Sequence, residues 1–184
     1  MPPELADEYE EMLRYGTVRS VDYSKGRVVI AVGEIETDDI HWLERRMGDT
    51  RTWSPPSVGE QVALLCPSGE IAGAVALGGI AQQSIPHVGN SARELVRFKD
   101  GAEVAYDPQS HQLDVLLPDG ATIVIRSTGG VSIDASTGGL SIKGDVTIDG
   151  KVTASGDVKA GSVSLQQHKH GGVSSGGAQT GTPV

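Results

Sequence analysis

Two histidines near the end of the chain, His168 and His170, are the side chains with the clearest chemical potential. Only Lys169 separates them, and in an extended chain residues two apart point to the same side. Neutral imidazole is a good ligand for zinc, copper, iron and nickel. A His-x-His pair in a polar tail also often occurs by chance on a protein surface, so its interpretation depends on the elements that position it.

The segment before the histidines, residues 127–165, is a series of short repeats. Two Ser-Thr-Gly-Gly segments lie nine residues apart, and a six-residue period follows from Gly144 onward. Apolar residues alternate within each repeat, as Val146 and Ile148 do, which is the pattern of a strand with one buried face. We predict short strands with glycine at the corners between them.

These repeats are too few to enclose a core in one chain. A single-chain β-helix needs about three short strands per coil and at least three coils, and the repeats supply barely two coils. Three copies wound about a common axis would each add one strand to every layer. The pattern therefore predicts a homotrimeric, intertwined triple-stranded β-helix, or β-prism.

A threefold axis changes the interpretation of the histidine pair. Three copies of His168 and His170 would bring six imidazoles to one point. Zinc prefers four ligands, whereas six nitrogens suit octahedral coordination, which favours iron and leaves nickel and cobalt open. We expect one ion per trimer, with further ions on the axis neither required nor excluded by the sequence. Six protein ligands leave no open position for catalysis.

Composition excludes several classes of function. The chain has 184 residues and a net charge of −9, so a basic nucleic-acid footprint is absent and we expect no nucleic-acid partner. The single cysteine, Cys66, lies in an apolar run and is interpreted as a small core residue. Neither a signal peptide nor an apolar run of membrane-spanning length is evident, so we expect assembly in a cytoplasm.

The N-terminal half predicts a small β-barrel. Residues 1–14 form a short helix or a disordered arm, and residues 15–80 contain five strands, the number in an OB-fold. The third strand is expected over residues 35–43, and a hairpin is expected between residues 61–66 and 70–77. Trp53 either stacks on a ligand or closes the barrel edge.

The remaining chain divides into a polar connector at residues 81–93, a rod at 94–165, and an apex with its tail at 166–184. Two Asp-Gly-Ala segments nineteen residues apart predict antiparallel strands joined by Asp-Gly turns at the start of the rod. Four residues there are interpreted as turn or solvated strand positions and not as catalytic groups: Asp107, His111, Asp114 and Asp119.

A family resemblance rests on residues 51–70, on the following Gly73 and Leu77-Gly-Gly, and on the Arg14-Tyr-Gly-Thr-Val opening. These segments resemble the baseplate assembly protein V family, the central spikes of contractile-tailed phages and of phage-tail-like bacteriocins such as R-type pyocins. The resemblance implies a trimer with an N-terminal OB-fold, a triple-stranded β-helix and an apex with iron at the His-x-His motif. It also implies that the N-terminal part docks on the tail hub and that the tail folds back over the tip.

The expected function is therefore mechanical. The trimer would be the membrane-piercing needle of a virion tail baseplate, or of a bacteriocin tip, driven through the target cell's outer membrane by sheath contraction. We expect no enzyme activity. Two alternatives stay open at this point: a hexapeptide-repeat acyltransferase with His168 or His170 as general base, and an OB-fold module that binds a ligand at the host surface.

Overall fold

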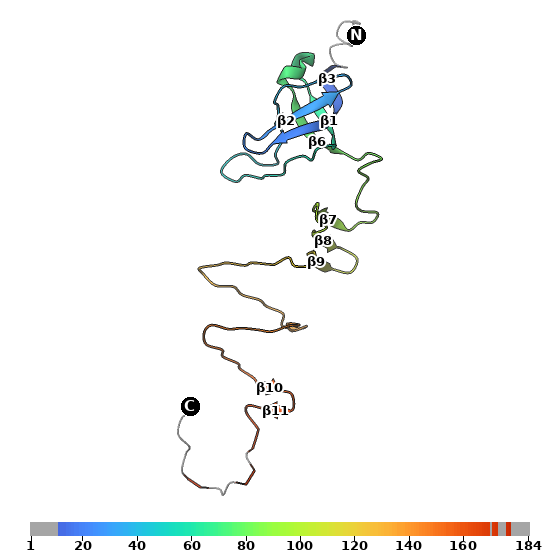
Figure 1. The fold of residues 1–184 in the computed structure, drawn as a ribbon. Helices are drawn as coiled ribbons and strands as arrows, with labels where there is room; N and C mark the ends of the chain where they lie inside the picture. Colours follow the sequence, from blue (N-terminus) through green and yellow to red (C-terminus); the bar gives the residue numbers. More distant parts are fainter. Residues whose placement is uncertain (1–10, 170, 173–175, 178–184) are drawn as a thin grey trace. The chain divides into compact units, whose positions relative to one another are not determined.

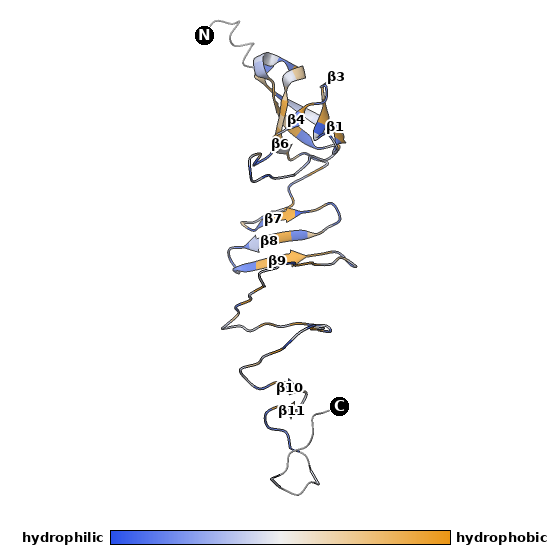
Figure 2. Ribbon diagram, turned by 90° about the vertical axis from the view of Figure 1, so that its left-hand side faces the viewer, coloured by the Kyte–Doolittle hydropathy of each residue, from blue (hydrophilic) through white to orange (hydrophobic). Residues whose placement is uncertain are grey.

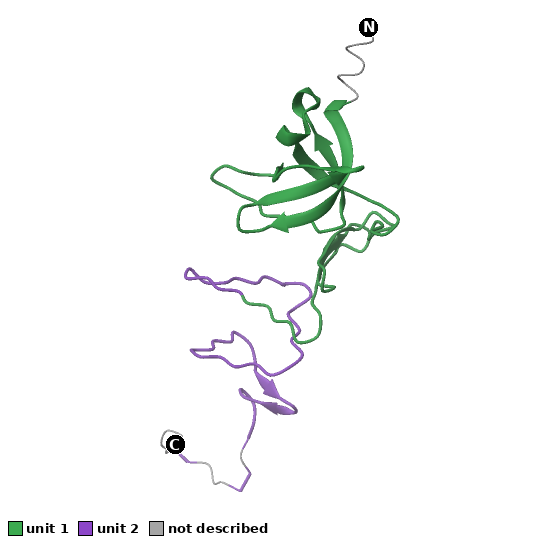
Figure 3. Ribbon diagram, turned by 45° about the horizontal axis from the view of Figure 1, so that its top comes forward, with its two compact units in different colours: residues 1–124 green, residues 125–184 purple. Residues whose placement is uncertain are grey.

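The computed structural model describes residues 11–169, 171–172 and 176–177. Regular structure in residues 13–169 consists of eleven strands and two short 3-10 turns, so the fold is all-β as expected (Figure 1). The chain divides into two compact units, residues 1–124 and 125–184, which are coloured separately in Figure 3.

The first unit opens with a six-stranded barrel. Its sheet order is β3-β2-β1-β5-β6-β4. The strands are β1 (Leu13–Asp22), β2 (Arg27–Val32), β3 (Ile35–Glu36), β4 (His41–Trp42), β5 (Gln61–Leu65) and β6 (Val75–Ile80). β1 pairs antiparallel with both β2 and β5, and β5 pairs with β6. The two ends of the sheet meet because Ile40 bridges to Val28 on β2, while β4 runs parallel to β6.

Local chemistry explains the tight curvature of the barrel. Asp22 ends β1 and accepts hydrogen bonds from the Ser24 hydroxyl and from the backbone N–H groups of Ser24 and Lys25, which closes the turn into β2. These bonds, that of the Ser24 hydroxyl first, hold the pKa of Asp22 at about 2. Gly16 lets β1 and β2 approach closely, because a Cβ there would collide with the Ile30 side chain and lie 2.7 Å from the Ala31 carbonyl.

The barrel has a dry core of small and branched side chains. Its buried members are Val18, Val28, Ile30, Ile40, Val62, Leu64, Cys66, Ala74 and Ala76. Cys66 is fully buried, as predicted, and burial raises the pKa of its thiol. The barrel therefore encloses its own interior within one chain.

Two sequence predictions for the barrel need correction. The third strand does not run continuously over residues 35–43 but divides into β3 and β4, because the chain must turn from β2 towards β6 to close the barrel. The expected hairpin exists, but its second strand begins at Val75, since Pro67–Gly69 and Ile71–Gly73 form 3-10 turns. The helix or arm predicted for residues 1–14 lies mostly outside the described residues, and β1 already includes Leu13.

A three-stranded antiparallel sheet follows the connector. It contains β7 (Glu94–Arg97), β8 (Glu103–Asp107) and β9 (Gln112–Leu116) in that order. The predicted Asp-Gly turn joins β7 to β8, with Gly101 at φ 90° and its N–H bonded to the Phe98 carbonyl. The second Asp-Gly pair lies in a turn after β9, but the residues after it are not assigned to a strand in the single chain.

The second unit consists mainly of extended segments and turns. Its regular strands are β10 (Lys159–Ala160) and β11 (Val163–Ser164), which pair antiparallel. Of the glycines that begin the short repeats, Gly144, Gly150 and Gly161 have positive φ, at 136°, 149° and 62°, as predicted, whereas Gly156 does not.

Candidate trimerisation surface and apex

The apolar residues of the rod repeats lie at the surface of the single chain. From Ile123 to Leu165 they are between 45% and 73% exposed, and Figure 2 shows the chain by hydropathy. They are Ile123, Val124, Ile125, Val131, Ile133, Leu140, Ile142, Val146, Ile148, Val152, Val158, Val163 and Leu165. A long regular series of exposed apolar residues marks an interaction surface and not an ordinary solvated face.

The backbone of this segment makes almost no hydrogen bonds within the chain. Across residues 122–157, all of which the structure describes, the only backbone–backbone hydrogen bond within the chain joins the Gly139 N–H to the Ala135 carbonyl, at 2.7 Å. Extended backbone normally satisfies its polar groups with neighbouring strands or with water. Strands from other copies would provide those partners and cover the apolar stripe together.

The β7–β9 sheet has two chemically different faces. Val96, Val104 and Val115 are paired directly across the three strands, and all three are exposed in the single chain. Residues on the other face alternate with them and include Ala105, which is buried, and Glu103. The sheet thus has one exposed apolar face and carries a polar network on the other.

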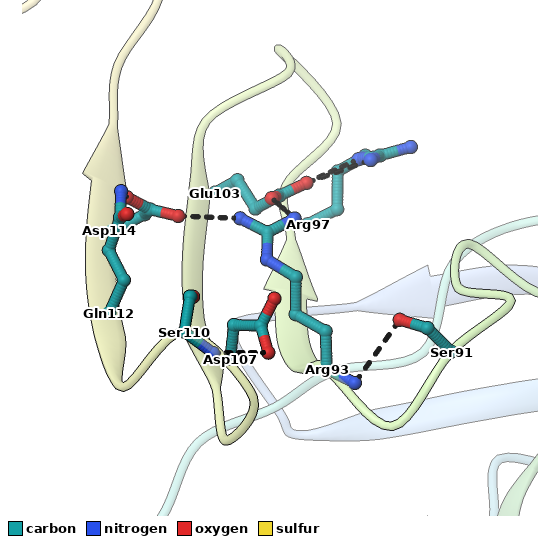
Figure 4. A network of polar contacts seen from close by, with 8 residues as sticks. All are labelled: Ser91, Arg93, Arg97, Glu103, Asp107, Ser110, Gln112 and Asp114. Atoms are coloured by element: carbon teal, nitrogen blue, oxygen red, sulfur yellow. Dashed lines mark hydrogen bonds and ion pairs between the residues drawn. The ribbon is translucent and has the colours of Figure 1, made fainter.

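The polar network centres on Glu103, whose side chain is only 7% exposed (Figure 4). Its two carboxylate oxygens lie 2.8 Å from an Arg93 nitrogen and 2.8 Å from an Arg97 nitrogen. Arg93 also donates to Asp114 at 3.0 Å, which joins all three strands. The hydrogen bond from Arg97, followed by the charge of Arg93, lowers the pKa of the Glu103 carboxyl below its ordinary value despite burial.

Sequence analysis missed this network, although a signal for it was present. Arg97 and Glu103 are equally spaced about Asp100 in a predicted hairpin turn, so they had to become cross-strand neighbours. The four residues set aside as non-catalytic behave largely as predicted. Asp107 accepts backbone N–H groups in the β8–β9 turn, and His111 occupies that turn with φ 56°. Asp114 instead belongs to the network.

The apex begins where the β10–β11 hairpin ends. Asp157 accepts a hydrogen bond from the Gln166 backbone, and the Ser164 hydroxyl accepts one from the Gln167 backbone. The Ser164 carbonyl accepts the His168 backbone N–H at 3.0 Å and lies 2.8 Å from His168 Nδ1. Because a carbonyl can only accept, Nδ1 carries a proton, and a neutral ring then has its lone pair on Nε2.

Of the two predicted metal ligands, the structure describes only the first. His168 lies in the turn just described, whereas His170 is outside the described residues. Within the described part of one chain, no group of three or more His, Cys, Asp and Glu side chains is arranged to hold a metal ion. The tail predicted to close the tip is likewise outside the described residues, apart from residues 176–177.

The barrel presents a second feature, a pair of tryptophans. Trp42 packs on the barrel core, and the Trp53 ring meets it edge-on with centroids 5.1 Å apart. Glu44 accepts hydrogen bonds from Trp42, Thr52 and the Ser54 backbone, which fixes the loop that carries Trp53. A hollow of about 680 Å³ beside the pair is lined by Glu44, Glu60 and Arg45 among others.

No helix in the described residues has the length and apolar character needed to cross a membrane. The regular elements are strands and short turns throughout residues 13–169.

Comparisons with known proteins agree with this architecture segment by segment. Residues 14–80 match the type VI secretion system/phage-baseplate injector OB domain. Residues 94–166 match the Gp138 beta helical trimerization domain, and residues 162–184 match the GpV Apex motif. A curated relative, the spike protein of Escherichia phage P2, is 32% identical over 205 aligned residues that cover 98% of this chain and 96% of the relative.

An OB domain followed by a β-helical trimerization domain defines a structural spike that assembles as a homotrimer, not an enzyme. The chain belongs to the phage baseplate spike protein family, whose place is the virion tail. The predicted family, the OB-fold with a β-helical trimerization domain, and the non-enzymatic class are thereby confirmed, and the acyltransferase alternative is excluded.

Proposed function

We propose that three copies of this chain form the membrane-piercing needle of a contractile tail, with an iron ion held at its tip by His168 and His170. The observation that carries the proposal is the apolar stripe along the rod, exposed in one chain and suited to burial between three. Interlocked strands resist local unfolding because each strand is paired with two other chains. A tip that must pass a membrane under load needs this resistance.

The described apex geometry supports His168 as a ligand through Nε2. Metal-bound histidines commonly donate the other ring nitrogen to a backbone carbonyl, which fixes ring orientation and tautomer. Here the Ser164 carbonyl is in position to accept from Nδ1. His170 follows two residues later, so six imidazoles from three chains would satisfy an octahedral ion. When bound, the ion would cross-link three chain ends where little apolar surface remains.

The N-terminal barrel is the segment that we propose attaches to the tail hub, since it matches a baseplate injector domain. The host-surface alternative gains no support from the hollow beside the tryptophans. In this proposal the barrel attaches the trimer to the tail, the rod transmits the load, and the apex penetrates the outer membrane.

Metal content tests the proposed site. We expect elemental analysis of the purified trimer to find about one iron per three chains. We expect His168→Ala and His170→Ala to lose the metal while the trimer persists, because the rod is held by its apolar interior. His87→Ala, which removes an exposed connector histidine, is the matched control and should keep the metal. Retention of iron in both apex variants would contradict the assignment.

Penetration is tested separately on assembled particles. A biotin-acceptor peptide is added at the C-terminus, and the ligase is confined to the periplasm of the target cell. We expect biotinylation after contraction and none from particles that adsorb but cannot contract. If tagged particles retain infectivity and the tag is never modified, the proposed passage of the tip through the outer membrane is wrong.

A further inference from the structure

The charged residues from Lys143, just before the first six-residue repeat, to Lys159 have a regular spacing that the apolar residues do not explain. They alternate with the inward-facing residues, so they lie on the outer side of the rod. They are Lys143, Asp145, Asp149, Lys151, Asp157 and Lys159. All six are exposed. Wherever two of them are six residues apart, the charges are opposite: Lys143 with Asp149, Asp145 with Lys151, and Lys151 with Asp157.

These opposite charges do not meet within one chain. None of the ion pairs found in the described part of the chain involves a residue beyond Asp114. The reason is the corner at each repeat. Gly144 and Gly150 have positive φ and separate successive extended segments, so residues six apart in one chain lie on successive segments.

Threefold symmetry brings the same residues together between chains. At each corner a chain passes to the next face of the β-helix and descends by one strand. On that face it lies beneath the preceding repeat of its neighbour, because three equivalent chains share every layer. The two strands run in parallel, so residue i of one chain stands beside residue i+6 of the other.

We propose that Lys143, Asp145, Asp149, Lys151 and Asp157 form ladders of ion pairs between chains, and that these ladders fix the axial register of the trimer. The partner is a second copy of this chain. The inference requires the trimeric β-helix but is independent of the metal and of membrane penetration.

The ladders resolve an ambiguity that the apolar repeats leave open. A chain displaced by one repeat would still place valine and isoleucine in the interior and glycine at the corners. Its charges would no longer match: Asp145 would stand beside Asp145 or Asp157 of its neighbours, and Lys143 beside Lys143 or the uncharged Ser155. Directly opposed like charges destabilise paired strands, so the displaced registers are disfavoured.

Each ion pair is exposed and contributes little by itself. The contributions of the ion pairs add up, because every contact occurs three times in a trimer. The ladder also favours the correct register over the displaced ones. Its influence must fall with salt, because screening shortens the range of exposed charges from about 10 Å at 0.1 M to about 3 Å at 1 M.

A charge-swap cycle on Lys143 and Asp149 tests the proposal in the full-length trimer. This pair is isolated because the next position in its series, Ser155, is uncharged. We expect Lys143→Asp and Asp149→Lys each to lower the melting temperature and the refolding yield of the trimer at low salt. The double variant, with the two charges exchanged, should recover both. Lys151→Asp should be the most severe single change because Lys151 faces an aspartate on each side.

Lys159→Asp is the matched control. It makes the same change in charge, but the residue six positions earlier is the uncharged Thr153, so we expect no comparable loss. An equal loss in Lys159→Asp, failure of the double variant to recover, or losses that persist in 1 M salt would each overturn the ladder.

Mixed refolding distinguishes contacts between chains from contacts within one chain. When Lys143→Asp chains and Asp149→Lys chains are refolded together, each can supply the charge that the other lacks. We expect native mass spectrometry to show mixed trimers above their statistical share at low salt. A statistical distribution, or an excess of unmixed trimers, would contradict pairing between copies even if the single variants fail to assemble alone.

Discussion

The barrel and the rod use the same alternating apolar strands, yet they differ in where the apolar side chains go. In the barrel, Ile30 and Leu64 are fully buried within one chain, whereas Ile148 of the rod is 58% exposed. The barrel closes because β4 reaches β6 and its segment also bridges to β2. Residues 122–157 of the rod have no such strand pairing within the chain, so their interior exists only when three copies supply it.

This difference has a mechanical meaning. A barrel that encloses its own core can be stable within one chain. A rod whose core is shared between chains cannot lose one strand without exposing the others, so its unfolding must be collective. The folding stability of the barrel thus comes from contacts within one chain. The folding stability of the rod depends on formation of the trimer.

The largest predicted effect comes from placing a charge in the shared interior. Ile148→Asp would bury three carboxylates around one axis, each costing several kcal/mol when unpaired. We expect the trimer to be lost, as measured by light scattering coupled to size exclusion. Thr147→Asp, on the outer side of the same segment, is the control and should remain trimeric. A trimeric Ile148→Asp would show that this side chain does not face the common interior.

A cavity in the barrel should have a smaller and strictly local effect. Leu64→Ala removes a fully buried side chain, and such changes cost about 2–5 kcal/mol. Both tryptophans of the chain, Trp42 and Trp53, belong to the barrel, so their fluorescence reports its unfolding. We expect the barrel transition to shift while the trimer mass is unchanged.

Leu65→Ala offers a matched control, because Leu65 is the next residue of β5 and is 40% exposed. It should shift the fluorescence transition much less. If Leu64→Ala also dissociates the trimer, the two regions are not energetically separate and the comparison between them fails.

The same contrast explains what could be predicted from the sequence. The Asp-Gly turn was sufficient to predict the β7–β8 hairpin, because turn chemistry is local. Alternation and the number of repeats were sufficient to predict the rod's trimeric nature. Division of the third strand into β3 and β4 was not predictable, since it depends on barrel closure over long distances. His168 could be proposed as a ligand only from its spacing together with the repeats before it and the family resemblance, and its orientation by the Ser164 carbonyl required the fold of the turn.

The smallest predicted effect concerns the β7–β9 sheet, which has an exposed apolar face like the rod repeats but is also stabilised by contacts within one chain, like the barrel. Glu103→Gln keeps the shape of the side chain but removes the charge that Arg93 and Arg97 share. We expect a melting temperature a few degrees lower near neutral pH, with trimer mass unchanged. Glu94→Gln, an exposed carboxyl on β7, is the control and should have no measurable effect.

The pH dependence of this variant has a definite sign. Because the folded protein lowers the pKa of Glu103, its contribution to stability is present above the ordinary carboxyl pKa and is lost as pH falls through the lower folded value. Glu103→Gln should therefore differ from the parent protein at neutral pH and converge with it in acid. A constant difference in melting temperature down to strongly acidic pH would mean that shape and packing, rather than the charge on Glu103, account for the loss.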